Sequence, residues 1–348
     1  MRRNDIIGAL RSLAALALVA CHRDGRTPVV LYSPHGRDQL TLLEQAFEAE
    51  RPEIDVRWLD MGSQEILDRV RFERVNPQAD VWFGGPTTTF DLGVRDSLLQ
   101  PYRPAWADRV GPNGVGPGDL YWPVYRTPAV IAYNSKVVSA AEAPHDWDDV
   151  LAPRWDDKIV IRDPMASGTM RAIWGLVLVR SIRETGDTAQ GMAWLRRLDA
   201  GTRTYALNPA ILDAKLARAE GLVTLWDLPD ILIGQSKGLP FGYTFPRSGT
   251  VVIDDAIGLV RGSRHPEAAR AFIDFVGGVE AQLLAAEHVF RLPARHDLPA
   301  HRVPAWVAEV EAEMVVAPMD WQMLAERGTA WMSYWDRHVR GSDRMASR

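Results

Sequence analysis

The chain has 348 residues and a formal net charge of −5, with 47% hydrophobic and 24% charged residues. That balance is typical of a globular protein, and the absence of a basic block in the sequence argues against nucleic-acid binding. With Cys21 as its single cysteine the chain cannot form an internal disulfide, and its length is sufficient for two domains.

The N-terminus has the pattern of an export signal. Arg2 and Arg3 precede residues 12–20, which are almost wholly Leu, Ala and Val. This run is too short to span a bilayer, which takes about 20 residues, but it suits the apolar part of a secretory signal. Residues 18–20 with Cys21 resemble the lipobox of bacterial lipoproteins, which implies cleavage before Cys21 and acylation of its thiol. A buried cysteine behind an apolar tail is the alternative.

The predicted N-terminal division is therefore a signal peptide at residues 1–20 and a lipidated tether at 21–27. Acylated Cys21 would hold the protein on a membrane at the periplasmic or extracytoplasmic face of the cell envelope, since the sequence has no other apolar run of membrane length. His22 does not decide between inner and outer membrane.

Three strand, loop and helix units follow the tether. Strands are expected at residues 29–32, 54–59 and 79–83, each followed by a loop and then a helical pattern. This alternation is typical of a parallel α/β sheet, in which ligands bind beyond the carboxyl ends of the strands.

A second α/β unit is expected after residue 134. Its strands are predicted at residues 158–161, 221–226, 241–245 and 251–260, with an apolar helix at 170–182. Crossings near Tyr125 and Ile253 predict two lobes joined by a strand hinge. The expected division is lobe 1 at 28–125, lobe 2 at 126–252, and a return segment with C-terminal helices at 253–348, where a helical pattern runs from Pro304 to Trp335.

Seven segments, taken in order, resemble the extracellular solute-binding proteins of bacterial ABC importers. They are residues 31–36, 79–86, 98–102, 131–134, 163–169, 193–198 and 265–275. The resemblance is narrower to the branch that contains ferric-iron, phosphonate, phosphoglycerate and hexose-phosphate binders. It implies a type II periplasmic binding fold of two α/β lobes, which as a monomer captures a solute and delivers it to a permease and ATPase.

An anion site is predicted where a strand meets the apolar helix of lobe 2. Ser167, Gly168 and Thr169 would bring free backbone N–H groups and two hydroxyls to the positive end of the helix dipole. Ser167 could equally serve as a simple helix cap. Gly85 and Thr87 could supply similar donors from lobe 1.

Four further contacts are candidates. Ser33 and His35 lie in the first loop, where the resemblance places ligand contacts, and His35 could donate to an anion or ligate a metal. Arg126 near the hinge could clamp a carboxylate or phosphate. Asp227 suits hydroxyls or an amine on a ligand whose other end is anionic, or it caps the following loop.

The iron-binding alternative has less support, because the sequence has no adjacent tyrosine pair near Asp227 and has Gly84 and Gly85 where the resemblance implies an acidic ligand. No metal site and no cofactor are predicted. A hydrolase is disfavoured, since the sequence lacks Gly-x-Ser-x-Gly and His-Glu-x-x-His. The prediction is thus a non-enzymatic lipoprotein that binds a small phosphorylated, phosphonate or carboxylate solute. A sensory or structural lipoprotein with the same fold stays open.

Overall fold

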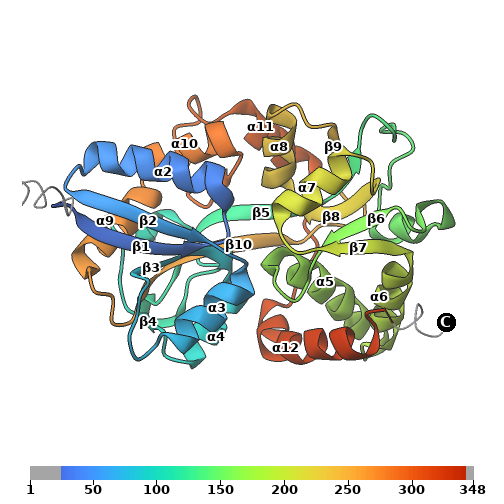
Figure 1. Ribbon diagram of the computed structural model, residues 1–348, viewed down its shortest axis with the longest axis horizontal. Coiled ribbons are helices and arrows are strands. Elements are labelled where there is room, and N and C mark those ends of the chain that lie inside the picture. Colours follow the sequence, from blue (N-terminus) through green and yellow to red (C-terminus); the bar gives the residue numbers. More distant parts are fainter. Residues whose placement is uncertain (1–24, 342–348) are drawn as a thin grey trace, which may run out of the picture.

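The computed structural model describes residues 25–341 and shows an α/β protein whose two lobes lie side by side along its long axis (Figure 1). One sheet runs through both lobes in the order β2-β1-β3-β10-β5-β8-β6-β7. The predicted α/β class is confirmed. The signal peptide, Cys21 and most of the tether lie outside the described residues.

Lobe 1 is built on parallel strands with helices on both faces. Its strands are β1 (Thr27–Ser33), β2 (Ile54–Asp60), β3 (Val81–Pro86) and β4 (Leu99–Gln100). Its helices are α2 (Gly36–Glu50), α3 (Ser63–Phe72), α4 (Thr87–Arg95), α9 (Pro266–Val276) and α10 (Val279–Val289). Because side chains alternate along a strand, Leu31 packs with α2, α9 and α10, while Tyr32 packs with α3 and α4 on the other face.

Two antiparallel strands form the hinge between the lobes. They are β5 (Trp122–Asn134) and β10 (Val252–Val260). The first half of β5 pairs with β10 and with β11 (Leu292–Pro293), and from Ala129 onward it pairs with lobe 2 strands. The change of partner follows Pro128, which has no N–H group to donate to a ladder.

Lobe 2 repeats the α/β arrangement. Its strands are β6 (Ile159–Arg162), β7 (Thr202–Ala206), β8 (Val223–Asp227) and β9 (Phe241–Thr244). Its helices are α5 (Gly168–Thr185), α6 (Ala189–Gly201), α7 (Pro209–Ala217) and α8 (Leu228–Ser236). Short 3-10 turns occur before β5 at Ala107–Arg109 and Pro117–Asp119, and after it at Trp147–Leu151 and Pro153–Trp155. Trp155, Trp174 and Trp194 are buried in the core of lobe 2.

The C-terminal helical pattern is two helices rather than one. They are α11 (Ala305–Glu313) and α12 (Trp321–His338). The break occurs because Thr250 binds the intervening main chain: its N–H donates to the Val315 carbonyl at 2.7 Å, and its carbonyl accepts from the Ala317 N–H at 2.8 Å. Helix α12 then contacts both α4 and α5, one helix from each lobe. Within residues 25–341 no helix has the length and hydrophobicity to cross a bilayer.

Candidate solute-binding site

A cleft of about 880 Å³ lies between the lobes, at the hinge. Five helices present their N-terminal ends to it, α2 and α3 from lobe 1 and α5, α7 and α8 from lobe 2. Each of these helices follows the carboxyl end of a strand, which is where parallel α/β sheets bind ligands. The N-terminal ends carry unpaired N–H groups and partial positive charge, so the cleft favours negatively charged groups.

The N-terminus of α5 is packed closely against lobe 1. Ser167 caps the helix by accepting a hydrogen bond from the Met170 N–H at 3.2 Å. Thr169 Oγ1 lies 3.5 Å from the Asp227 carboxylate. A Cβ atom on Gly168 would lie 2.5 Å from Pro86 Cδ, which belongs to lobe 1. The absence of a side chain at Gly168 thus allows the two lobes to touch beside the cleft.

Asp255 on β10 organises the lobe 1 wall, and the sequence patterns did not single it out. Its buried carboxylate accepts hydrogen bonds from the Gly85 N–H at 3.1 Å and from the Thr127 hydroxyl. His35 Nε2 lies 3.9 Å from the same carboxylate. Although burial opposes it, the neighbouring His35 ring, then Arg291 and the Thr127 hydroxyl, hold the pKa of Asp255 below its usual value. The adjacent Asp254 and Asp255 within the otherwise apolar strand at 251–260 were the available signal.

His35 is buried, with a relative exposure of 5%. A Cβ atom on Gly84 would lie only 2.4 Å from the ring, which requires glycine there; its φ is 94°. Neither ring nitrogen has a hydrogen-bond partner among the described residues. Burial, reinforced by Arg291, lowers the pKa of His35, so the ring is neutral and can donate from one nitrogen.

Arg291 supplies a buried positive charge at the back of the cleft and was also missed from the sequence. Its side chain is 4% exposed, its Nε donates to Gln39 Oε1 at 2.6 Å, and it lies 4.0 Å from Asp230. No local motif marks it, because Gln39 and Asp230 come from distant parts of the chain.

The lobe 2 wall is acidic. Asp227 caps α8 by accepting from the Asp230 N–H at 3.1 Å, and Asp230 accepts from Trp226 Nε1 at 3.0 Å. Burial raises the pKa of Asp227 well above its usual value, with Asp230 adding to the effect. Burial likewise raises the pKa of Asp213 to about 7.

The cleft therefore combines two kinds of charge. Its basic side chains are Arg37, Arg162, Lys237 and Arg291, and its acidic side chains are Asp38, Asp60, Glu65, Asp213, Asp227, Asp230 and Asp255. The acidic side chains outnumber the basic ones, whereas the helix N-termini add positive potential. Such a lining suits a solute that has a negative group at one end and hydrogen-bond donors at the other.

The structure brings together six of the nine predicted contact residues. His35, Gly85, Ser167, Gly168, Thr169 and Asp227 all line the cleft. Ser33 is fully buried at the end of β1, where its hydroxyl accepts from the His35 N–H at 3.3 Å. Thr87 and Arg126 line a separate hollow, and Arg126 pairs with Glu311 on α11. We therefore leave Thr87 and Arg126 out of the proposed contacts and treat Ser33 as a support for His35.

We expect Asp213→Asn to change how stability depends on pH. Between pH 4 and 7 the folded protein keeps a proton on Asp213 that the unfolded chain has released, so stability falls as pH rises through this range. The stability of the Asp213→Asn variant should not fall in this way between pH 4 and 7. Since solvent screens the partly exposed group, the variant should gain roughly 1–2 kcal/mol relative to wild type between pH 5 and pH 8.

Urea unfolding at both pH values measures this difference. Glu267→Gln, at a side chain 84% exposed, is the isosteric control and should show little change. An Asp213→Asn variant whose stability difference from wild type is the same at pH 5 and pH 8 would contradict the raised pKa.

Residues 87–326 match the family model described as bacterial extracellular solute-binding protein. The chain belongs to this family. A probable ABC transporter periplasmic-binding protein of Sinorhizobium fredii is 26% identical over 339 residues, covering 94% of this chain and 90% of that protein. A putative 2-aminoethylphosphonate-binding periplasmic protein of Salmonella typhimurium is 26% identical over 293 residues, covering 82% and 83%.

The fold of this solute-binding protein is also that of solved periplasmic binding proteins. The structure of AfuA from Actinobacillus pleuropneumoniae with exogenous fructose-6-phosphate superimposes with a TM-score of 0.78 at 20% identity, covering 90% of this chain and 99% of that one. The type II fold expected from the sequence is confirmed by this likeness.

The two lobes of the solute-binding protein touch on both sides of the cleft. The Gln64 N–H of lobe 1 donates to the Ala166 carbonyl of lobe 2 at 3.3 Å, and Lys237 pairs with Asp38 across the cleft at 2.5 Å. These contacts describe a closed arrangement. Within residues 25–341 no group of three or more His, Cys, Asp or Glu side chains has the geometry of a metal site.

Proposed function

We propose that this solute-binding protein captures a small solute with a phosphate, phosphonate or carboxylate group and delivers it to an ABC permease and ATPase. The convergence of five helix N-termini on one cleft carries this proposal. The protein acts as a monomer, anchored outside the cytoplasm by a lipid on Cys21, and binds its solute without converting it.

In the proposed complex the anionic group lies at α5, between the two lobes. The N–H groups of Gly168 and Thr169 and the hydroxyls of Ser167 and Thr169 face it, and the Gly85 loop approaches from lobe 1. Each charge-assisted hydrogen bond contributes about 1.5–3 kcal/mol net, so a few suffice for micromolar affinity after the cost of closure.

The other end of the solute lies against Asp227 and Asp230. These carboxyl groups accept hydrogen bonds, and when ionised they attract a cation, so an amine or hydroxyl groups fit there. An aminophosphonate and a sugar phosphate both meet the two requirements, and the relatives named above provide one test compound of each kind. Ferric iron fits less well, because among the described residues no three His, Cys, Asp or Glu side chains are placed so that they could hold one metal ion.

A thermal-shift screen tests the proposal. We expect 2-aminoethylphosphonate, fructose 6-phosphate or a related anion to raise the melting temperature, since a ligand at a hundred times its Kd stabilises by about 2.7 kcal/mol. Ser167→Ala combined with Thr169→Ala should abolish the shift. Thr188→Ala is the matched control, because Thr188 precedes α6 in the same lobe and makes no side-chain cap.

A shift only with ferric iron, retained in the double variant, would replace anion capture by iron binding. If none of the tested anions raises the melting temperature, a sensory or structural role is favoured instead.

A further inference from the structure

The two most exposed large apolar side chains of the described residues are three positions apart in sequence, at and just after the end of α3. Phe72 is 87% exposed and Val75 is 89% exposed. Single exposed apolar residues are ordinary, but two almost fully exposed ones within four residues at a helix end give this tip of lobe 1 an apolar character.

Three arginines come from the same part of lobe 1. Glu73 and Arg74 lie between the two apolar residues in sequence, and both line a small surface pocket together with Arg261. Arg264 donates to Asn76 Oδ1 at 2.6 Å, which joins it to the loop that carries Val75. We call Phe72, Val75 and the three arginines the basic tip. Among residues 25–341 the three arginines donate to uncharged acceptors: Arg74 to the Arg71 carbonyl, Arg261 to the Ser97 carbonyl and Arg264 to Asn76.

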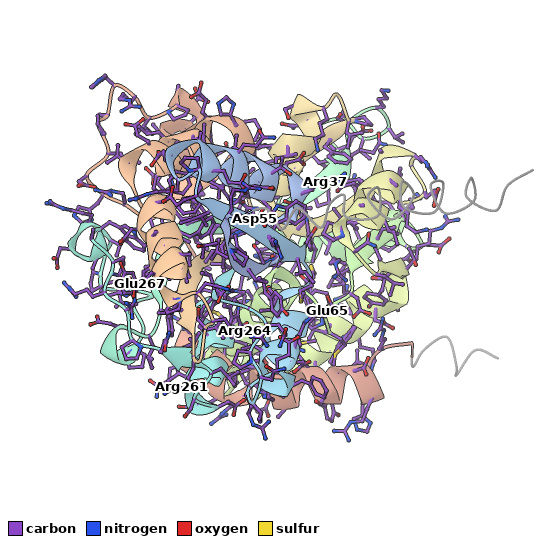
Figure 2. The ribbon with its side chains drawn as sticks, turned by 60° about the vertical axis from the view of Figure 1, so that its left-hand side comes forward. Arg37, Asp55, Glu65, Arg261, Arg264 and Glu267 are labelled. Atoms are coloured by element: carbon purple, nitrogen blue, oxygen red, sulfur yellow. The ribbon has the colours of Figure 1, made fainter. Side chains whose placement is uncertain are left out.

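The nearby acidic side chains do not neutralise these arginines. Glu73 accepts from the Tyr32 hydroxyl and from Arg69, and Asp96 pairs with Arg71. The basic tip is therefore a positively charged surface that carries two exposed apolar side chains. Figure 2 shows Arg261 and Arg264 on the outer side of lobe 1, whereas the cleft residues Arg37 and Glu65 lie toward lobe 2.

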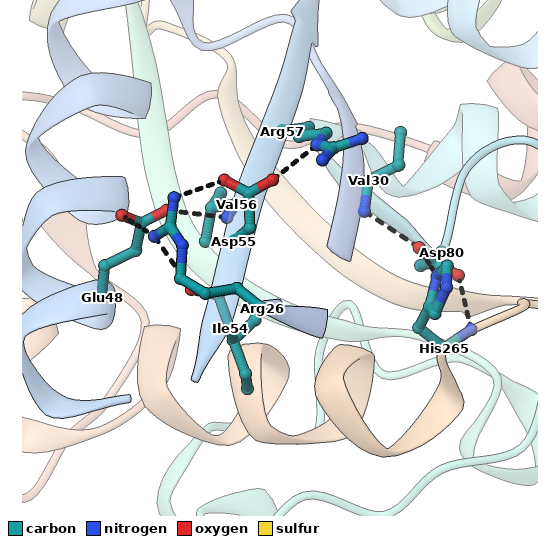
Figure 3. Close-up of polar contacts among 9 residues, drawn as sticks. All are labelled: Arg26, Val30, Glu48, Ile54, Asp55, Val56, Arg57, Asp80 and His265. Carbon is teal, nitrogen blue, oxygen red and sulfur yellow. Dashed lines mark hydrogen bonds and ion pairs between the residues drawn. The ribbon is translucent and has the colours of Figure 1, made fainter. Parts of the chain in front are cut away.

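The chain enters the fold at the same end of lobe 1. Arg26 is fixed there by Glu48 at 2.8 Å and by Asp55 at 2.9 Å (Figure 3). Strand β1 starts at the next residue, and its Val30 N–H donates to Asp80 at 2.9 Å.

Asp80 in turn connects β1 to the basic tip. Its carboxylate accepts a hydrogen bond from the His265 N–H at 3.0 Å (Figure 3). Because His265 directly follows Arg264, Asp80 links the segment that carries Arg264 to β1. The starts of the parallel strands β1, β2 and β3 and the end of the antiparallel strand β10 share one edge of the sheet, and the basic tip lies at that edge.

We propose that the basic tip rests on the membrane, with Phe72 and Val75 in the headgroup region and the three arginines on anionic lipid phosphates. This proposal rests on the lipid anchor of the proposed function. Cys21 is five positions before the fixed Arg26, and an extended chain of that length reaches at most about 18 Å. An anchored protein would thus hold this end of lobe 1 near the bilayer, where basic and aromatic side chains bind anionic surfaces.

The test uses the full-length protein purified from membranes and placed on vesicles. An environment-sensitive fluorophore on Gln78→Cys reports on the basic tip without removing any of its members, and Val137→Cys in lobe 2 is the control position. The protein without an introduced cysteine is first treated with the fluorophore as a control, because an acylated Cys21 cannot react with it. Labelling of Cys21 would overturn the anchor and with it this orientation.

On vesicles containing one third phosphatidylglycerol, we expect the label at position 78 to shift to the blue and to be shielded from iodide at least threefold relative to pure phosphatidylcholine. The label at position 137 should not respond. Changing Arg74, Arg261 and Arg264 together to Glu should remove the difference, as should 0.5 M salt, and Phe72→Ser with Val75→Ser should reduce the blue shift.

Equal signals at both positions, or a response at position 78 that requires the permease complex rather than anionic lipid, would overturn the proposal. The thermal shift with ligand is measured on the same preparations. A preparation that binds ligand normally but shows no lipid-dependent signal separates failure of this inference from failure of solute capture.

Discussion

Arg291→Met is expected to destabilise the protein by roughly 3–5 kcal/mol, because it removes the buried cation beside Asp230 and leaves that carboxylate with the exposed Lys237 as its nearby counter-charge. The melting temperature should fall by about 5–12 °C. Methionine fills most of the same space, so the loss of stability reflects the missing charge more than the missing volume. Thermal unfolding monitored by circular dichroism at pH 8 gives the value.

The pH dependence of this loss separates charge from packing. Asp227 and Asp230 have raised pKa values because they are buried, so protonation at pH 5 should lower the cost of losing Arg291. Arg302→Met is the control: its ion pair with Glu280 is on the surface, and such pairs contribute about 0–1 kcal/mol. An equal loss at pH 5 and pH 8 would show that Arg291 acts through packing alone.

Gly168→Val is expected to weaken ligand binding at least about 100-fold, the equivalent of ~2.7 kcal/mol, while leaving each lobe folded. A side chain at this position meets the Pro86 ring at 2.5 Å and the Ser63 hydroxyl at 2.8 Å, both in lobe 1. A proline ring cannot swing aside, so the lobes must stay apart. Without closure the solute contacts only one lobe and loses half of its hydrogen bonds.

Calorimetry measures the affinity, and small-angle scattering with and without ligand measures closure. Wild type should contract on binding and Gly168→Val should not. Gly111→Val is the control, because nothing lies within 4 Å of a Cβ atom there. A Gly168→Val variant that binds within threefold of wild type would show that closure does not bring α5 against Pro86.

The secondary structure of both lobes was largely predictable from local patterns. Residues 29–32 and 158–161 were expected as strands and form most of β1 and β6. The C-terminal region was less predictable, because the break between α11 and α12 depends on main-chain hydrogen bonds to Thr250, which is more than sixty residues away in sequence. Helical periodicity alone does not contain that pairing.

The sequence by itself determined the α/β class, the two lobes and the loop at Ser167 and Gly168, because strand and helix periodicities and the glycine-bearing turns between them are local properties. Only the tertiary structure decided which charges meet in the cleft. Asp255 reaches the Gly85 N–H across 170 positions, and Arg291 reaches Gln39 across 252. Arg126 shows the same limit, since its partner Glu311 lies 185 positions away and draws it from the cleft. Such pairs depend on how the sheet is assembled, and no spacing along the chain encodes the distance between two side chains after folding.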